Sequence, residues 1–543
     1  MTSTLSHLLL QAADAHPGRP AVWSSAGELT YVELFDRSMR LGRALVEHGI
    51  EPGDRVVIAL AKDLALPVAI YGTLLAGAAY VPVDYLTPPA RAHAIAADAE
   101  AVAVISTPRT TRAMVLGDAH PDGPSDNSPA LHWLGRGWFD PDRSPERQPV
   151  SASLSGLPQI GRWRSVEVPA SALAYILYTS GSTGRPKGVA HTHASALAFV
   201  RWAADAVGLQ ETDVLSQHAS PSFDLSVFDF FGAALAAARL TLVPASTFGR
   251  VASLCRFIVE TGVTVWYSVP SALLRASSAE SLPLLSGSAL RQVILAGEEI
   301  PVGPLRVLWQ NLPPSCRVAN WYGPTETNVC TFHDLTALDV ESGDSIPIGR
   351  ACPYASTLLV AEDSAVTRDG AAGELLVASQ TLMSGYWKLP DATSRVFSTG
   401  PDRQTYYATG DLVSRDDARG FTFRGRVDRL LKVRGHRVQP EEVEHVLEQR
   451  AEIDEAAVVK HRQGEDEVLA AVVRVAGGAA LEGNAVIGHC RRFLPPYMVP
   501  DVILPVDELP RGSRGKADYR AVLELVESHR ADPARLEQAG NRG

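Results

Sequence analysis

The deciding stretch of this chain reads Thr179-Ser180-Gly181-Ser182-Thr183-Gly184-Arg185-Pro186-Lys187-Gly188. It follows a short apolar run, 173–178, which predicts a buried strand. Glycines allow the backbone to turn and approach an anion, and successive N–H groups form a concave site for phosphate oxygens. The hydroxyls add donors, and Lys187 adds a positive charge. The stretch therefore predicts a polyphosphate-binding loop, although its spacing differs from the G-x-x-x-x-G-K-[ST] of a Walker A loop.

Length and composition indicate a globular protein of two or more domains. The chain has 543 residues, of which 46% are hydrophobic, so it can bury more than one core. Its formal net charge of −11 argues against a general nucleic-acid binder. The five cysteines are scattered and form no C-x-x-C pair, which argues against a zinc ribbon or a disulfide framework. This cysteine usage fits a cytoplasmic protein.

The N-terminal residues and one uncharged window bear on membrane association. Residues 1–18 lack the basic start and cleavage signal of a secretory leader and predict an amphipathic helix. The window 64–83 contains no charged residue and is long enough to span a bilayer. Because it contains Pro67, Gly72 and Gly77, we expect a buried helix that leads into a buried strand instead. We therefore expect no membrane contact.

Strand-like and helix-like segments alternate along much of the chain, which predicts parallel sheets with crossover helices. Residues 29–34 are expected to open a helix, 55–61, 101–105, 290–295 and 317–322 to form strands, and 373–422 to be β-rich. Residues 108–168 have no steady period and predict an irregular surface insertion. The alternative for this insertion is a small cap around Trp133, Leu134, Trp138 and Phe139.

Two motifs carry groups that suit a nucleotide. In the motif 320–326, Tyr322 can stack on a purine and Asn320 can bond an adenine edge. The same motif offers the Thr325 hydroxyl to the α-phosphate, and Glu326 is a hard oxygen ligand for Mg²⁺. In the motif 407–412, Asp411 is expected just after a strand and can accept both ribose hydroxyls.

These motifs, in this order, resemble the adenylate-forming superfamily of acyl-CoA synthetases, luciferases and the adenylation domains of nonribosomal peptide synthesis. The resemblance runs from about Leu29 to Lys516. It implies an α/β fold with a large N-terminal domain of mixed and parallel sheets and a small, mobile C-terminal α+β domain. The expected bounds are 1–427 for the large domain, 428–525 for the small one and 526–543 for a tail, with Asp428 as the hinge.

The resemblance also assigns roles to individual residues. It implies that Lys516, in Arg-Gly-Lys-Ala-Asp-Tyr, is the catalytic lysine that bridges the substrate carboxylate and the α-phosphate, assisted by Thr183 and Glu326. An isolated basic loop of this kind would otherwise predict a solvated turn. The implied ATP-binding residues are Thr179, Ser180, Gly181, Ser182, Gly184, Lys187, Asn320, Tyr322, Thr325, Asp411 and Arg426, with Glu326 as the Mg²⁺ ligand.

Residues 223–229, Phe-Asp-Leu-Ser-Val-Phe-Asp, select the branch of the superfamily. They resemble the amino-acid-activating members, in which the aspartate, here Asp224, pairs with the substrate ammonium. A buried carboxylate without a counter-charge is costly, so the site prefers a substrate that brings a positive charge. The alternative is that Asp224 caps a helix or lies on the surface.

Motif-by-motif matching gives the residues expected around the substrate side chain. They are Leu225, Phe228, Ser268, Ile294, Ala296, Trp321, Val329 and Cys330, between the anchors Asp224 and Lys516. This lining has no further charge, so we expect acidic and basic amino acids to be rejected. Phe228 and Trp321 take up much of the volume. We therefore expect a small neutral substrate: alanine first, then glycine or serine, with proline as the alternative.

The resulting hypothesis is a free-standing amino-acid adenylation enzyme of natural-product, including antibiotic, biosynthesis. It forms an aminoacyl-AMP from ATP with Mg²⁺ and loads the phosphopantetheine thiol of a separate carrier protein. No carrier attachment site follows Lys516, which is why the carrier is expected to be a separate chain. A D-alanine–carrier protein ligase, an acyl- or aryl-CoA ligase and a non-catalytic scaffold are the alternatives.

Overall fold

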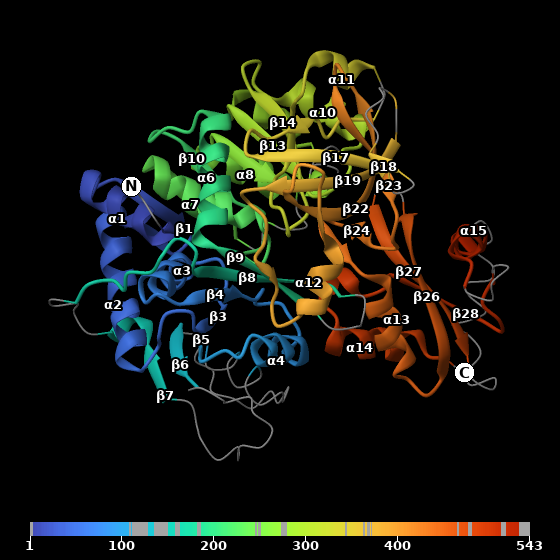
Figure 1. The fold of residues 1–543 in the computed structure, drawn as a ribbon, viewed down its shortest axis with the longest axis horizontal. Helices are drawn as coiled ribbons and strands as arrows, with labels where there is room; N and C mark the ends of the chain where they lie inside the picture. The colour runs from blue at the N-terminus through green and yellow to red at the C-terminus, as the bar shows by residue number, and fades with distance from the viewer. Residues whose placement is uncertain are drawn as a thin grey trace. The chain divides into compact units, whose positions relative to one another are not determined.

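We describe the protein from a computed structural model (Figure 1). It describes residues 4–107, 110, 114, 129–134, 150–157, 163–181, 186–244, 247, 251–272, 280–342, 345–361, 364–365, 370, 372–463, 466–475, 481–511 and 517–530. The chain forms two compact units. The first comprises Met1–Tyr85, Ala92–Tyr178 and Gly188–Val427, and the second comprises Leu86–Arg91, Thr179–Lys187 and Asp428–Gly543.

The first unit contains a nine-stranded sheet. Its strands lie in the order β16 (Arg350–Ala351), β15 (Thr331–Asp334), β14 (Arg317–Tyr322), β13 (Gln292–Ala296), β12 (Val265–Ser268), β10 (Val214–Gln217), β11 (Arg239–Leu242), β1 (Pro20–Ser24) and β2 (Gly27–Thr30). All pairs from β14 to β1 are parallel, and the pairs at the two edges are antiparallel. Residues 290–295 and 317–322 thus contribute strands, as predicted.

A second sheet of eight strands carries the phosphate-loop sequence between two of its strands. The order is β20 (Gly385–Tyr386), β9 (Lys187–Thr192), β8 (Leu173–Thr179), β4 (Ala79–Pro82), β3 (Arg55–Ala59), β5 (Ala103–Ser106), β6 (Ala130–Trp133) and β7 (Val150–Ser153). The last two strands lie inside the segment 108–168, which we expected to be irregular. They pair antiparallel and extend the sheet from β5. Trp138 and Phe139 of the alternative cap lie outside the described residues.

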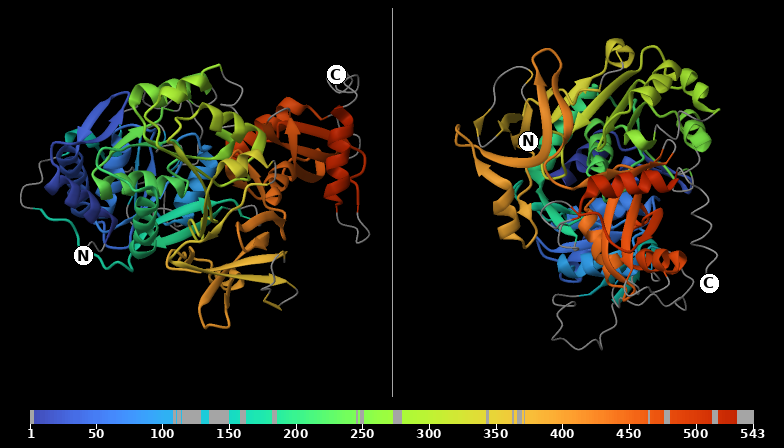
Figure 2. Two further views of the ribbon diagram at one scale, coloured as in Figure 1. Left: turned by 90° about the horizontal axis from the view of Figure 1, so that it is seen from above. Right: turned by 90° about the vertical axis from the view of Figure 1, so that its right-hand side faces the viewer.

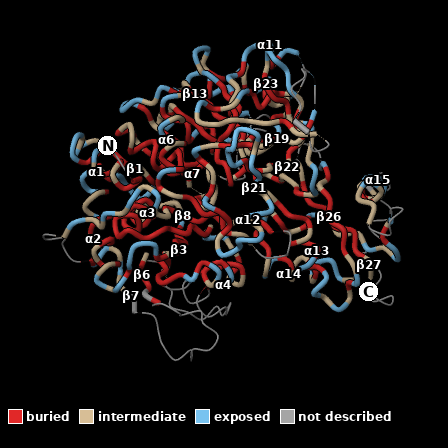
Figure 3. The backbone as a smooth tube through the Cα atoms, in the orientation of Figure 1, coloured by how far each residue is buried: buried red, intermediate tan, exposed pale blue. Residues whose placement is uncertain are grey.

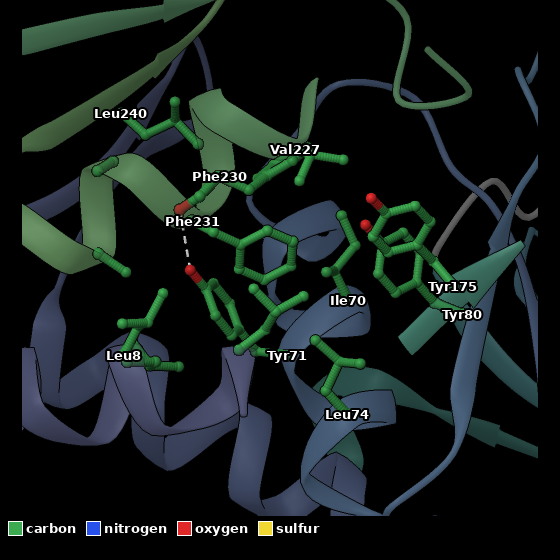
Figure 4. Close-up of a cluster of buried hydrophobic side chains, with 14 of the residues drawn as sticks. Leu8, Ile70, Tyr71, Leu74, Tyr80, Tyr175, Val227, Phe230, Phe231 and Leu240 are labelled. Atoms are coloured by element: carbon green, nitrogen blue, oxygen red, sulfur yellow. Dashed lines mark hydrogen bonds between the residues drawn. The ribbon is translucent and has the colours of Figure 1, made fainter. Parts of the chain in front are cut away.

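Helices of the first unit pack between these two sheets and share one core with both. They are α1 (Leu5–Ala15), α2 (Tyr31–Glu47), α3 (Ala65–Leu75), α6 (His193–Val207) and α7 (Leu225–Ala236). The shared core includes Ile58 and Tyr80 from the second sheet and Leu215 and Leu240 from the first. Figure 4 shows side chains of α1, α3 and α7 meeting there, with the Tyr71 hydroxyl donating to the Phe230 carbonyl at 2.9 Å.

The helix predicted to open at 29–34 begins at Tyr31 and not at Leu29. Leu29 and Thr30 end β2, and the Thr30 hydroxyl caps α2 by accepting from the Glu33 N–H, while the Glu33 carboxylate accepts from the Thr30 N–H. This capping box places the helix start one residue after the last strand residue. The described helices outside the shared core are α4 (Pro89–Asp98), α8 (Val251–Thr261), α10 (Val302–Asn311), α11 (Ala337–Glu341) and α12 (Pro390–Val396).

The uncharged window 64–83 folds as α3 and β4, and every residue from Leu66 to Leu75 is buried (Figure 3). Of the helices in the described part of the chain, none is both long enough and apolar enough to cross a membrane. All five cysteines are free. The apolar character of 64–83 is therefore explained by the core of the first unit.

A third, antiparallel sheet completes the first unit. It is formed by β18 (Ser364–Ala365), β17 (Ala355–Ala361), β19 (Ala372–Ser379), β22 (Thr405–Asp416), β21 (Phe397–Thr399) and β23 (Gly420–Arg426). The β-rich stretch predicted over 373–422 accounts for most of it. Its core contains Leu359, Leu375, Val413 and Tyr322.

The second unit is an α+β module, drawn in orange to red beyond Asp428 (Figure 2). It contains the hairpin β24 (Leu431–Val433) and β25 (His436–Val438), the sheet β26 (Ile453–Gln463), β27 (Asp466–Val475) and β28 (Val502–Val506), and the helices α13 (Pro440–Glu448), α14 (Gly483–Phe493) and α15 (Tyr519–Arg530). The α/β class, with a large mixed-sheet domain and a small α+β domain, is confirmed.

Tyr71→Phe is expected to lower the free energy of unfolding by about 0.5–1.5 kcal/mol, because it removes the buried hydrogen bond that the Tyr71 hydroxyl donates to the Phe230 carbonyl of α7. Urea denaturation followed by tryptophan fluorescence measures this change. Tyr85→Phe, at an exposed tyrosine, is the control and should leave the free energy of unfolding unchanged. Equal stability of the two variants would contradict the assignment of this bond to the core.

Candidate nucleotide and substrate site

The phosphate-loop sequence connects the end of one strand to the start of the next in the sheet. Thr179 is the last residue of β8 and Lys187 is the first of β9. The Thr179 hydroxyl donates to the Lys187 carbonyl at 3.5 Å. Ser180 and Gly181 are buried, whereas Ser182, Thr183 and Gly184 lie outside the described residues. The strand–loop–strand arrangement agrees with the sequence pattern.

The turn after β14 carries the next group of predicted residues. Asn320 and Tyr322 are in β14, and the chain then folds back so closely that a Cβ on Gly323 would lie 1.7 Å from the Asn328 carbonyl oxygen. Asn328 itself has a φ of 53°, a left-handed conformation that asparagine tolerates. Thr325 and Glu326 occupy this turn, so its geometry fixes where the hydroxyl and the carboxylate are presented.

Three predicted ATP-binding residues meet through hydrogen bonds. The Tyr322 hydroxyl donates to Asp411 Oδ2, and the Arg426 guanidinium donates to Asp411 Oδ1. Asp411 is buried within β22, paired with Arg426 of β23, and so does not follow a strand as we expected. Burial and the neighbouring Asp411 carboxylate raise the pKa of Tyr322 well above its usual value, so its hydroxyl stays protonated. The Asn320 amide donates to the Pro347 carbonyl at 2.8 Å.

The predicted metal ligand, Glu326, is held by two contacts that sequence reasoning missed. The Tyr386 hydroxyl donates to Glu326 Oε1 at 2.8 Å, and the Met383 N–H donates to the Glu326 carbonyl at 2.8 Å. His191 Nε2 lies 2.9 Å from the Thr325 carbonyl, and burial lowers the pKa of His191 to about 4, so it is neutral. His191 and His193 are both buried core histidines. No spacing in the sequence signals these contacts, because Tyr386 is 60 residues from Glu326.

The donor set around Glu326 fits Mg²⁺. This ion commonly uses one or two protein carboxylates and takes its other ligands from phosphates and water. Over the described residues, no cluster of three or more His, Cys, Asp or Glu side chains could hold a metal ion on its own. Glu326 is a single carboxylate that is 2% exposed and fixed by Tyr386. A metal ion at Glu326 would therefore need ligands beyond this one side chain.

Asp224 lies at the start of α7 and its side chain makes no capping hydrogen bond to the helix. It is half-buried. The Tyr175 and Tyr267 hydroxyls lie close enough for its negative charge to add to the effect of burial, which raises the pKa of both tyrosines. The helix-capping alternative for Asp224 is thus not supported by the structure.

Most residues predicted to surround the substrate side chain pack into one group. These are Leu225, Phe228, Ile294, Ala296, Trp321 and Val329, all in the core shared by the two large sheets. The Phe228 and Trp321 ring centroids are 5.8 Å apart. Cys330 packs instead with Tyr322 against the third sheet, and burial raises its pKa to about 12.

Ser268 does not join this group, because consecutive strand residues point to opposite faces. The Ser268 hydroxyl lies 2.6 Å from His218 Nδ1. Its neighbour Tyr267 contacts Phe228 and Trp321, with centroid distances of 6.1 and 5.2 Å, and pairs in register with Ile294. Tyr267, and not Ser268, is therefore the β12 residue that shares a face with Phe228 and Trp321. The alternation of strand residues opposite Ile294 is the signal that could have identified it.

Two further predicted positions belong to the second unit. Lys516 lies outside the described residues, and the residues that frame it, Arg511 and Ala517, form an antiparallel bridge. Asp428 is the first residue of the second unit after Val427, and its carboxylate accepts from the Leu430 N–H at 3.3 Å. A boundary between the two units falls at Asp428, while the second unit also includes Leu86–Arg91 and Thr179–Lys187 from the range 1–427 expected for the large domain. The hinge role of Asp428 stays a prediction.

The fold and these motifs together define a nucleotide-dependent, adenylate-forming enzyme. Residues 9–387 match the model of the AMP-binding enzyme family, and residues 442–516 match that of the AMP-binding enzyme C-terminal domain. The chain belongs to this family, and it is an ATP-dependent ligase.

Similar proteins extend over nearly the whole chain. An L-proline–[L-prolyl-carrier protein] ligase of Streptomyces coelicolor is 35% identical over 96% of both chains. A ligase of the same name from Pseudomonas fluorescens is 33% identical over 96% of this chain and 99% of its own. The solved structure of the amide bond synthetase McbA from Marinactinospora thermotolerans has the same fold, with a TM-score of 0.80 at 24% identity over 96% of this chain and 99% of its own.

Tyr386→Phe is expected to slow ATP–pyrophosphate exchange and to raise the Mg²⁺ concentration needed for it. A hydrogen bond to a charged group contributes about 1.5–3 kcal/mol, so the loss should be roughly tenfold or more. The measurement is exchange as a function of Mg²⁺.

The control for this variant is Tyr406→Phe, which removes a similar hydroxyl bond, to Asp402 at 2.8 Å, away from the site. Its exchange should match that of the wild type. An unchanged Mg²⁺ dependence in Tyr386→Phe would show that this hydroxyl does not position Glu326.

Proposed function

We propose that the enzyme activates L-proline with ATP and loads the prolyl group onto the phosphopantetheine thiol of a separate carrier protein. In the first step, a carboxylate oxygen of proline attacks the α-phosphorus, and pyrophosphate leaves as prolyl-AMP forms. In the second step, the deprotonated thiol attacks the prolyl carbonyl carbon, and AMP leaves. The observation that carries the proposal is the 35% identity, over 96% of both chains, to a proline–carrier protein ligase.

We propose proline in place of alanine, which the sequence favoured, because both proline ligases match this chain over 96% of its length. The side chains around the proposed substrate pocket favour a substrate with a compact apolar ring. Phe228, Tyr267, Ile294 and Trp321 present rings and branched carbon, with Asp224 as the charged group beside them. Each buried methylene contributes about 0.8 kcal/mol, so a proline ring gains more there than a single methyl.

The anchors of the amino acid follow from charge. We assign Asp224 to the secondary ammonium of proline, because a carboxylate among buried tyrosines is stabilised by a bound cation. Lys516 is assigned to the carboxylate and the α-phosphate, where its ammonium balances the charge that builds up as the two anions approach. Together they hold the two ends of the substrate.

The nucleotide is assigned to the residues around the turn after β14. Asp411, oriented by Tyr322 and Arg426, accepts the ribose hydroxyls. The phosphates lie against the loop that begins at Thr179, with Thr183 and Lys187 as donors. Glu326 would hold Mg²⁺, which would neutralise phosphate charge.

We propose that the second unit takes part in both half-reactions, one after the other. In the first it brings Lys516 to the substrate, and for the second it turns about Asp428 so that the carrier's phosphopantetheine reaches the adenylate. The carrier is assigned as a separate chain because the proline ligases that match this chain over 96–99% of their own length are named for a prolyl-carrier protein substrate.

ATP–pyrophosphate exchange over a panel of amino acids tests the substrate. L-proline should support the fastest exchange, ahead of alanine, glycine and serine by tenfold or more, because their side chains leave part of the apolar lining unfilled. Charged and large aromatic amino acids should be inactive. A preference for alanine, or for any charged amino acid, would overturn the proline assignment.

Lys516→Ala should reduce prolyl-dependent exchange by at least about 100-fold, because a donor aimed at developing charge is lost. ATP binding, measured by calorimetry, should change little. The control is Lys432→Ala, at a lysine in the β24–β25 hairpin of the same unit. It removes the same charge, so it measures how much of the loss of exchange comes from the change in net charge alone. A Lys516→Ala enzyme that retains more than about a tenth of wild-type exchange would exclude the catalytic role.

A further inference from the structure

Trp321 is enclosed by four aromatic rings. Its centroid is 4.8 Å from that of Trp202, 5.2 Å from Tyr267, 5.8 Å from Phe228 and 6.4 Å from Phe199. Trp321 itself is only 2% exposed. Aromatic rings in such tilted and edge-to-face contacts hold one another in place. The position of the Trp321 indole is therefore set by its neighbours.

Trp202 differs from the other rings around Trp321. Phe199, Phe228 and Tyr267 are buried, whereas Trp202, on α6, is half-buried and reaches the surface of the first unit. Of the four rings it is also nearest to Trp321. If the Trp321 indole is to move away from the other residues predicted to surround the substrate side chain, it has to displace one of the rings around it. Trp202 is the ring among these that is partly exposed to solvent.

Trp202 also contacts the segment that follows the turn after β14. Its ring is 5.4 Å from that of Phe332 and 5.6 Å from that of Tyr354. The Tyr354 hydroxyl donates to the carbonyl of Val329 at 2.6 Å. One half-buried side chain thus contacts Trp321 directly and reaches Val329 through a single intermediate.

We infer that Trp202 is a specificity-determining residue that acts from behind Trp321: it holds the Trp321 indole against the substrate side chain and so limits the size of the ring that the enzyme accepts. This inference rests on the proposed function, because it takes Trp321 as part of the substrate lining. Trp202 does not touch the substrate. It is a positioning residue, and the size limit depends on two layers of aromatic rings and not on the lining alone.

Three cyclic imino acids that differ by one methylene test the inference: azetidine-2-carboxylate, proline and pipecolate. One methylene changes discrimination in an apolar pocket by about 10–200-fold. In Trp202→Ala, the exchange kcat/KM for pipecolate relative to proline should rise at least tenfold, because the Trp321 indole can move into the vacated space. The ratio of azetidine-2-carboxylate to proline should stay the same. Trp202→Phe, which keeps a ring, should preserve most of the wild-type selectivity.

The matched control is Trp309→Ala. Trp309 is also a half-buried tryptophan on a helix, α10, but it packs against a separate core. A loss of stability alone lowers kcat/KM for all three imino acids together, and Trp309→Ala should show only that. If the pipecolate-to-proline ratio of kcat/KM were the same in Trp202→Ala and Trp309→Ala, the inference would be overturned.

A double-mutant cycle separates an effect through Trp321 from an independent one. Trp321→Ala should itself raise the pipecolate-to-proline ratio. In that background Trp202→Ala should change the ratio less than threefold, because the ring that Trp202 positions is gone. Full additivity of the two substitutions would mean that Trp202 acts by another route, and would also overturn the inference.

The same experiment distinguishes failure of the inference from failure of the proposed function. A wild-type enzyme that prefers another amino acid contradicts the proline assignment. The cycle is then run with that amino acid and its homologue longer by one methylene. A wild-type enzyme that prefers proline, with selectivity unchanged in Trp202→Ala, contradicts the inference alone.

Discussion

The burial of α7 between the two large sheets is the constraint on which the substrate site depends. Every residue from Leu225 to Ala234 is buried. The helix therefore cannot rotate or shift along its axis without breaking core contacts. Two tyrosine hydroxyls fix its carbonyls: Tyr71 bonds Phe230, and Tyr31 bonds Ala233 at 2.9 Å. A helix fixed in this way presents Asp224 at its start and Phe228 one turn later in positions that the core sets. The position of Asp224, which we propose anchors the amino acid, is thus a consequence of core packing.

The turn after β14 joins two parts of the proposed site. Glu326 and Val329 are three residues apart, yet one belongs to the proposed metal and phosphate region and the other to the side-chain lining. The close approach of Gly323 to the Asn328 carbonyl leaves no room for a side chain between them. Tyr386 and Tyr354 hold the turn from its two sides by bonding Glu326 and the Val329 carbonyl.

The parts of the fold predicted from the sequence were those with strong local signals. Continuous apolar runs identified β8, β13, β14 and the pair α3 and β4, and glycine-rich turns marked the phosphate loop. The strands β6 and β7 were missed because their pairing partner is β5, and strand pairing is not visible in a segment of mixed composition. Ser268 was predicted and Tyr267 was not considered, because a match of motifs ignores which face of a strand a residue occupies. Tyr386 and His191 were missed because their contacts join residues far apart in the sequence.

The position of Cys330 has a chemical consequence for an enzyme that makes an acyl adenylate. Such an intermediate reacts with any thiolate that it meets, including one supplied by the enzyme. Burial raises the pKa of Cys330 to about 12, so its thiol stays protonated at neutral pH. Cys352, also buried, has a pKa raised further. Burial thereby keeps the Cys330 and Cys352 thiols protonated, which protects these two residues from acylation by the adenylate.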